Sequence, residues 1–575
     1  MHLPVLKPIP TTRKVLDIFR GYNRDLRIRE GEFRDMENLT SDHFPLIASR
    51  KPRSFHASLI SPQGIIAKEE ICCVDGPDFL IGQQRVAMNL SVRHEDCPKQ
   101  LVSMGAYVLI FPDKMYINTV NPQDRGSLEA EITCEGVGIS LCDAQGGEFT
   151  PQYIQNSVPQ QPQNGEYWLD TSQNPAAMKQ WAETAGMWMP VSDTHLCLSA
   201  PGIGTLFSDA DAVTVTGVPE IEPRAVIAAK GADFLVFPGL ITQSRRVNTP
   251  VTVTRKIPKM DFVIESGNRL WGCRYGLDDT GEPVNRIYAS KLGDFRNWNS
   301  FLGLASDSYY VSLGTDGPFT GAITHLGVPL FFKEKVLHKI YGSQPSEFAV
   351  QDTPCRGVQP GCHGSLAIVG ENLCYKSWHG VCLYDGSLPR DIGHPLGNPP
   401  CRQAVGGAIG GKYYLSMGDD KEWNLFVYDS VWNLWHREDD FHALGFATLG
   451  EELYAIDEDH YQIIGMLGTG ETREEGVCWQ AQTGELGLSD CTMAYISRLT
   501  LRLQLEKGAK LDVYAQYDHS PEWEHLACIR QKSLGTISIP MRPRRSDYLR
   551  LKFAGTGDCR IYALTKTIEK GSEVS

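Results

Sequence analysis

The sequence has no apolar segment long enough to cross a bilayer. Its first residues, MHLPVLKPIPTTRKV, also lack the continuous apolar core of a signal peptide. From these two absences we expect a protein that is synthesised and folded in a cytoplasm.

The sequence also lacks an excess of basic residues. It holds 69 acidic and 55 basic residues, for a formal charge of −14. Duplex DNA is bound by neutralising phosphates with Lys and Arg, so this balance disfavours any general role in wrapping nucleic acid.

The cysteines lack the paired short spacings of a zinc site. Sixteen of them are scattered along the chain, many at apolar strand positions. The densest group with a histidine is Cys355, Cys362, His363, Cys374 and Cys382. We predict reduced, structural thiols and no bound metal or cofactor.

What the chain does contain is the composition of a folded protein. Its 575 residues are 42% hydrophobic and 22% charged, which allows two or three domains with ordinary cores. The 55 glycines and 34 prolines favour many turns over long helices.

A repeated pattern organises the chain. Residues 404–437 have the pattern of a small antiparallel sheet, with strand-length apolar segments separated by Gly, Asp and Asn. Its central feature, a glycine followed three and four residues later by apolar side chains, recurs at Gly105, Gly231, Gly267, Gly327, Gly370, Gly410 and Gly450. Most steps from Gly231 onward are near the length of one four-stranded propeller blade.

This period predicts an all-β fold with a β-propeller of six or seven blades, because one small twisted sheet cannot bury both of its faces alone. Each marker glycine is expected in the turn between the first two strands of a blade, where a positive φ is needed.

The remaining segments give the predicted domain organisation. Residues 1–60 are an extended lead-in, and residues 61–119 and 223–470 form the propeller. Residues 120–222 are an inserted mixed domain with a helix at 175–183, since Ala176, Ala177 and Gln180 are good helix formers. Residues 471–575 alternate apolar and charged residues and are predicted to form a C-terminal β-sandwich.

Two groups of residues admit a second interpretation. Trp378, Trp423, Trp432 and Trp435 either fill gaps between blades or form a sugar-binding platform. The acidic segments 418–422 and 457–460 fit hairpin tips better than calcium loops, because they lack alternating ligands and a terminal bidentate Glu. We therefore predict no catalytic, cofactor-binding or metal-binding residues.

Two sets of residues carry a resemblance to a known family. The first is Phe19, Gly21, Asn23, Gly31, Glu32, Met36, Asn38, Asp42, Pro45, Arg50, Pro52 and Arg53. The second is the segment RIYASKLGDFRNW, residues 286–298, which ends in a Gly-Asp-x-x-Asn-Trp turn. Both resemble the packaged-DNA stabilisation or tail nozzle proteins of short-tailed bacteriophages, loosely from Phe19 to about Ile568.

The resemblance implies a structural virion protein, not an enzyme, made in the host cytoplasm and located in the virion tail. It implies a homo-oligomeric ring, expected to be a hexamer, that closes the DNA channel after packaging and opens for DNA ejection. Partners would be other tail proteins (adaptor, fibres or needle), the genomic DNA in transient passage, and the host surface. From the charge balance we expect an acidic channel.

Two alternatives remain open. One is a carbohydrate-binding or glycan-degrading propeller tail protein, for which paired carboxylates would converge at the propeller axis. The other is an interaction propeller of the kelch kind, suggested by Gly406-Gly407, Tyr413-Tyr414 and Trp423.

Overall fold

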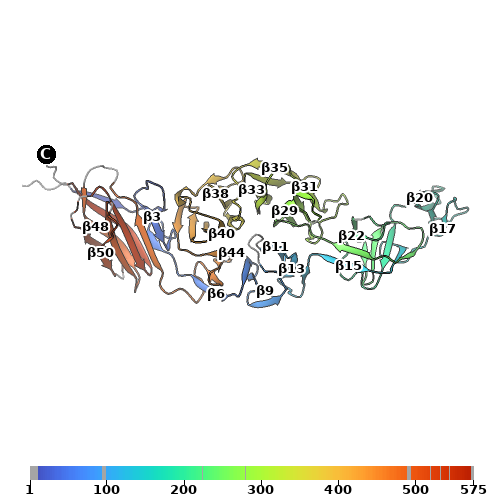
Figure 1. Cartoon of the computed structure of the whole chain (residues 1–575), viewed down its shortest axis with the longest axis horizontal. Helices are drawn as coiled ribbons and strands as arrows, with labels where there is room; N and C mark the ends of the chain where they lie inside the picture. Colours follow the sequence, from blue (N-terminus) through green and yellow to red (C-terminus); the bar gives the residue numbers. More distant parts are fainter. Residues whose placement is uncertain are drawn as a thin grey trace, which may run out of the picture.

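The computed structural model describes residues 11–570, except 93–98, 223, 279, 488–493, 519, 531–532, 543 and 545. The fold is all-β: the described residues form 53 strands and only two short 3-10 helices, η1 (His363–Ser365) and η2 (His394–Leu396). None of the described helices is long and apolar enough to cross a membrane. The molecule is elongated and has three parts in a row (Figure 1).

The middle part consists of seven four-stranded antiparallel sheets, which we call the seven-sheet array. Its first three sheets are β7 (Pro62–Ala67), β8 (Ile71–Asp75), β9 (Asp78–Ile81) and β10 (Gln84–Ala87); β11 (Gln100–Met104), β12 (Tyr107–Phe111), β13 (Met115–Asn118) and β14 (Arg125–Ser127); and β28 (Phe262–Ser266), β29 (Arg269–Leu277), β30 (Pro283–Ala289) and β31 (Tyr309–Ser312).

The other four are β32 (Phe319–His325), β33 (Val328–Lys333), β34 (Val336–Tyr341) and β35 (Ala349–Pro354); β36 (Ala367–Val369), β37 (Asn372–Ser377), β38 (Gly380–Tyr384) and β39 (Arg390–Asp391); β40 (Gln403–Ile409), β41 (Lys412–Gly418), β42 (Trp423–Asp429) and β43 (Leu434–Arg437); and β44 (Ala443–Leu449), β45 (Glu452–Asp457), β46 (Gln462–Gly465) and β6 (Ser54–Ser58).

The first strands of consecutive sheets contact one another around the array. The contacts run β7–β11, β11–β28, β28–β32, β36–β40 and β40–β44, and β32 reaches the next sheet through η1, which precedes β36. The first strand of the last sheet, β44, contacts β7 of the first. The last sheet takes its fourth strand, β6, from the N-terminal segment, so residues distant in sequence complete one sheet.

Six of the seven marker glycines lie where the pattern predicts. Gly105, Gly267, Gly327, Gly370, Gly410 and Gly450 each sit between the first two strands of a sheet, with φ from +57° to +76°. A Cβ at any of the six would have no atom within 4 Å. The predicted positive φ is confirmed, and backbone conformation alone accounts for these glycines.

The seventh marker was assigned to the wrong unit. Gly231 precedes β25 (Phe234–Pro238), which pairs with β21 and β24 in the inserted part of the chain. The remaining array sheet begins instead at β7, whose turn to β8 consists of Lys68, Glu69 and Glu70. This turn lacks a glycine, so the repeat pattern could not detect it.

The insertion lies between β14 and β28 and forms one end of the molecule (Figure 1). Its three sheets consist of β15 (Ala130–Cys134), β27 (Val251–Arg255), β22 (Ala212–Thr216) and β23 (Arg224–Val226); β24 (Ala229–Lys230), β25, β21 (His195–Ser199), β16 (Val137–Cys142) and β26 (Arg245–Val247); and β17 (Tyr153–Gln155), β18 (Tyr167–Asp170), β19 (Ala177–Ala182) and β20 (Met187–Pro190).

Two predictions for this region were wrong. Its sheets extend past residue 222 to Arg255. The helix predicted at 175–183 is the strand β19, which pairs with both β18 and β20, because cross-strand pairing overrides a weak local helix preference. In the described residues the insertion is therefore built of strands and not mixed.

The other end of the molecule is a terminal two-sheet unit (Figure 1). One sheet contains β4 (Leu39–Thr40), β5 (Ile47–Ser49), β53 (Cys559–Lys570), β48 (Ala494–Leu505), β51 (Gly535–Pro540) and β1 (Thr11–Leu16). The other contains β2 (Gly21–Tyr22), β3 (Glu32–Glu37), β47 (Cys478–Thr483), β52 (Leu549–Thr556), β49 (Lys510–Tyr517) and β50 (Glu524–Ile529).

The N-terminal segment thus supplies five strands to this unit, where an extended lead-in separate from the C-terminal region was predicted. β1 pairs with β53 and β3 pairs with β47, in both cases across most of the chain length. One buried apolar cluster runs from the terminal unit into the sheets of β32–β43. The terminal unit and the array therefore share a core.

Candidate functional site

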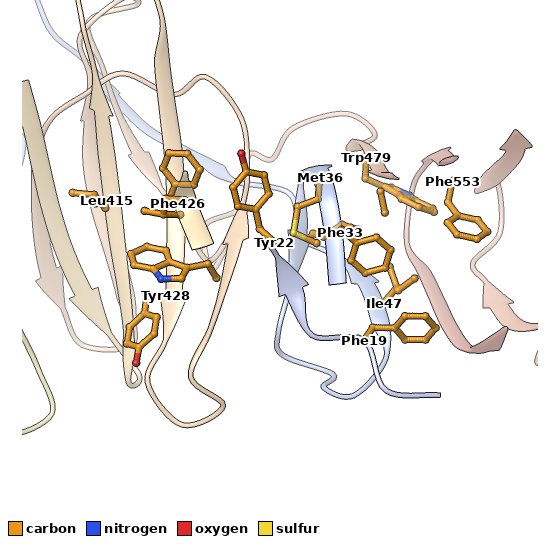
Figure 2. Packing of buried hydrophobic residues seen from close by; sticks show 14 of the residues in the cluster. Phe19, Tyr22, Phe33, Met36, Ile47, Leu415, Phe426, Tyr428, Trp479 and Phe553 are labelled. Carbon is orange, nitrogen blue, oxygen red and sulfur yellow. The ribbon is translucent and has the colours of Figure 1, made fainter. Parts of the chain in front are cut away.

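Several residues that carry the N-terminal resemblance lie at the junction between the terminal unit and the array. Phe19 and Met36 of this set are buried in the shared core, and the adjacent Tyr22, outside the set, packs on Phe426 of β42 with ring centroids 5.7 Å apart. Figure 2 shows these side chains as a continuous path from β42 to the terminal unit. Within the resembling set, Asp42 and Pro45 are exposed.

Two glycines of this set have backbone neighbours that exclude a side chain. A Cβ on Gly21, where φ is +83°, would lie 2.3 Å from the carbonyl oxygen of Trp435 in β43. A Cβ on Gly31, where φ is +100°, would lie 2.4 Å from the carbonyl oxygen of Ile18. Only glycine satisfies both the conformation and the close approach.

A buried group of ionised side chains, which we call the clasp, joins the segment before β6 to the loops that leave the last two sheets. Arg53 donates from Nη2 to Glu438 Oε2 at 2.8 Å and to Asp439 Oδ1 at 2.9 Å. Arg50 donates from Nη1 to Glu474 Oε2 at 2.7 Å. The side chains of Arg50, Arg53 and Glu438 are 7%, 5% and 8% exposed, whereas that of Glu474 is 39% exposed.

The electrostatics of the clasp follow from this pairing. Burial alone would raise the pKa of Asp439, but the attraction of Arg53 and Arg50 and a hydrogen bond from Arg53 hold it below its usual 3.8. Burial likewise opposes ionisation of Glu474, and hydrogen bonding to Arg50 lowers its pKa below 4.5. Asn38, with φ of +54°, accepts a bond from Arg50 Nε at 2.7 Å and extends the network to β47 through Cys478.

The second resembling segment lies at the other junction, between the array and the insertion. Asn297 is 1% exposed, and its Oδ1 accepts a hydrogen bond from the amide of Ala212 in β22 at 2.7 Å. Phe295 and Trp298 on either side are buried in a core with Ile257. Residues of the first resembling set therefore join the array to the terminal unit, and residues of the second join it to the insertion.

The first strands of the seven array sheets contain one acidic residue, Glu265 in β28. Its Oε1 accepts a hydrogen bond from the amide of Asn268 at 2.8 Å and so serves the adjacent turn. The pair of carboxylates that glycoside hydrolysis requires is not supplied by these strands.

An aromatic cluster occupies the far end of the insertion, which we call the tip (β17–β20; Figure 1). The ring of Trp188 has edge contacts with Trp168 and Trp181 at 5.5 Å and with Tyr153 at 6.1 Å. Met187 and Met189, which flank Trp188 in β20, are 54% and 45% exposed. The tip thus places aromatic and sulfur-containing side chains at the surface farthest from the terminal unit.

The tryptophans that the sequence singled out do not form one platform. Trp435 is buried at 1% exposure, whereas Trp432 and Trp378 are each 50% exposed. Trp423 stacks on His442 with centroids 3.7 Å apart. Of Trp378, Trp432 and Trp435, only Trp435 therefore packs in the core.

The cysteines and the acidic loops were the candidate metal ligands in the sequence. Among the described residues, no group of three or more His, Cys, Asp or Glu side chains is arranged to hold a metal. The fourteen described cysteines are free thiols; Cys97 and Cys491 lie outside the described residues. Asp419 and Asp457 each accept bonds from amides in their own turns, as hairpin tips do.

Comparison with known proteins gives only distant structural neighbours. No family model matches the chain, and no curated protein matches it. An exo-β-1,3-galactanase from Phanerochaete chrysosporium aligns at 10% identity over 52% of this chain and 95% of its own, with a TM-score of 0.21. A family 43 arabinoxylan arabinofuranohydrolase from Bacillus subtilis aligns at 11% identity over 52% and 94%, with a TM-score of 0.19.

An acylaminoacyl peptidase from Pyrococcus horikoshii aligns at 12% identity over 49% of this chain and 46% of its own, with a TM-score of 0.23. These neighbours are enzymes, against the expectation that this chain is not one, and that expectation is withdrawn. TM-scores this low transfer neither a fold nor a site to the chain.

Proposed function

We propose that this chain is a ring-forming subunit in the tail of a short-tailed bacteriophage, located around the channel through which the genome leaves. We further propose that its seven-sheet array is a closed seven-bladed β-propeller. The contact of β44 with β7, and the completion of the last sheet by β6, support closure of the array.

One observation carries the proposal: residues from both resembling sets make contacts at the two junctions of the molecule. Gly21 and Asn297 each meet a backbone atom of the neighbouring part, and Arg53 forms the clasp. Gly21, Arg53 and Asn297 thus lie at positions that join three parts in a row, which suits an elongated tail subunit.

The charge of the chain supports a role beside moving DNA. A net −14 on each subunit is multiplied around a ring, and the resulting field repels phosphates at distances up to about 8 Å in physiological salt. Phosphate contacts by Lys and Arg would instead retain the genome. The six subunits of the proposed ring come from the family resemblance alone, as do the adaptor, fibre or needle partners and the virion location.

Microscopy of the purified full chain and of the intact particle tests this proposal. We expect closed rings of one size, with six copies centred on the tail axis. A head-to-tail interface that failed to close would give filaments instead. A chain that remains monomeric and occupies a peripheral appendage of the particle contradicts the proposal.

The tip supports a second candidate function, in which the tail protein binds glycans of the host surface. Aromatic rings present large apolar faces at low entropic cost, and Trp181 and Trp188 remain partly exposed on β19 and β20. This candidate concerns the binding of a glycan by the tip alone.

Screening the full chain on immobilised bacterial glycans tests this candidate. We expect Trp181→Ala to weaken the binding of a captured glycan by about tenfold or more, since it removes one ring of the cluster. Trp432→Ala, a 50% exposed tryptophan of the array, is the matched control and should bind normally. Equal losses in both variants, or no captured glycan, would rule the candidate out.

A further inference from the structure

A cavity of about 550 Å³ lies at the junction of the terminal unit and the array. Its walls come from three segments: β2–β3 of the terminal unit, the loop after η2, and β42–β43. Tyr22 and Phe426, adjacent in Figure 2, form part of the wall. A cavity of this size falls within the range of small-molecule sites.

Three arginines, Arg24, Arg34 and Arg437, line the cavity, each from a different strand or loop. Arg24 donates from Nε to the hydroxyl of Tyr22 at 2.8 Å. Arg437 donates from Nε to Asn424 Oδ1 at 2.7 Å and weakly from Nη1 to the carbonyl of Met36 at 3.5 Å. Each guanidinium has five N–H donors, so most of them have no strong partner.

The carboxylates near these arginines do not satisfy them. Asp35 lies 4.0 Å from Arg24 Nη2 and 3.9 Å from Arg437 Nη1, beyond hydrogen-bond distance in both cases. Arg34 Nη1 is 3.9 Å from Glu485. Among the lining residues three arginines outnumber the two carboxylates, Asp35 and Glu422, and Glu485 beside Arg34 lies outside the lining.

The position of Arg24 is fixed by the array. Its amide donates to the carbonyl of Pro395 at 2.8 Å, and its Cβ passes so close to Gly397 that a side chain there would lie 2.8 Å away. Gly397 has φ of +70°, which favours glycine independently. The backbone and Cβ of Arg24 are therefore fixed beside the cavity, and its half-exposed side chain has no carboxylate within hydrogen-bond distance.

We infer that this cavity binds an oxyanion, either a phosphate group or a carboxylate. Guanidinium groups match both geometries through paired N–H donors, and an anion placed between Arg24, Arg34 and Arg437 would take up the donors that Asp35 leaves unpaired. The inference is independent of ring formation, since every wall of the cavity belongs to one chain.

Calorimetric titration of the full chain with inorganic phosphate, at constant ionic strength with chloride as the reference anion, tests the inference. Arg34→Gln is the informative variant, because Arg34 makes only the 3.9 Å contact and its loss leaves no hydrogen-bond partner behind. We expect saturable binding by the wild type and a loss of affinity of about tenfold or more in Arg34→Gln.

Arg286→Gln is the matched control, since it removes the same charge from β30, which does not line the cavity. It should bind phosphate as the wild type does. A parallel titration with hexaglutamate distinguishes the two kinds of oxyanion. Tighter binding of phosphate indicates a phosphorylated ligand. Tighter binding of the peptide indicates the carboxylates of an acidic protein segment. No saturable binding of either probe, or equal losses in both variants, overturns the inference.

Discussion

Replacing Arg53 by methionine should lower the free energy of unfolding by about 3–5 kcal/mol, the usual cost of removing one partner from a buried ion pair. The Arg53 side chain is 5% exposed and bonds both Glu438 and Asp439. Methionine fills much of the same volume but removes the nearer cation from Glu438 and Asp439, which keep only longer contacts of 3.8 and 3.4 Å to Arg50. Urea denaturation followed by tryptophan fluorescence measures the loss.

Acidification provides an internal check on this result. The folded-state pKa of Asp439 is held below 3.8, so its contribution is fully present above that pH and is lost as the pH falls through the folded value. The difference between wild type and Arg53→Met should therefore shrink in strong acid.

Arg402→Met is the matched control for the clasp. Arg402 pairs with Asp420, but the two side chains are 67% and 78% exposed. Water already screens this pair, so its loss should leave the urea midpoint almost unchanged. A midpoint that falls as far in Arg402→Met as in Arg53→Met would show that the clasp is not a special source of stability.

How much of this fold could be predicted is best seen at the marker glycines. A two-residue turn needs a residue with positive φ, and a glycine in the turn is visible in the sequence itself. The glycines at 105, 267, 327, 370, 410 and 450 all have positive φ. The sheet that begins at β7 turns through Lys68, Glu69 and Glu70, so no local signal marks it. Gly231 fits the pattern but precedes a strand of the insertion, because a strand's sequence does not specify its partner.

The N-terminal strands could not be predicted for a different reason. β2 has two residues and β4 has two, too few for any periodicity. Their places depend on distant partners, as when β6 pairs with β46. The resemblance marked this segment as important without revealing that it holds the terminal unit to the array.

The junction cavity was also beyond sequence reasoning, and no site residue was predicted. Arg24, Arg34 and Arg437 carry no motif, and Arg437 is about four hundred positions from the other two. What singles them out is the lack of hydrogen-bonded carboxylates around them, which only the folded chain reveals.

Substituting alanine for Gly21 should be among the most damaging single changes to the chain. The added Cβ would lie 2.3 Å from the carbonyl oxygen of Trp435, a backbone atom that cannot rotate away. Trp435 is itself fixed, since it is 1% exposed and donates from Nε1 to the carbonyl of Ile392 at 2.7 Å. We expect a loss of about 4 kcal/mol or more, combining left-handed backbone strain with forced separation of β2 from β43.

Gly105→Ala separates these two contributions. Gly105 also has a positive φ, +57°, but a Cβ there would have no atom within 4 Å. Alanine at this position should lower the free energy of unfolding only through left-handed backbone strain, by about 1–2 kcal/mol. The excess loss in Gly21→Ala, measured by urea denaturation of both variants, then reports the close contact between the terminal unit and the array. Equal losses would mean that β2 moves away from Trp435 at little cost, and that the junction holds the two parts together less rigidly than the contacts of Gly21 and Tyr22 imply.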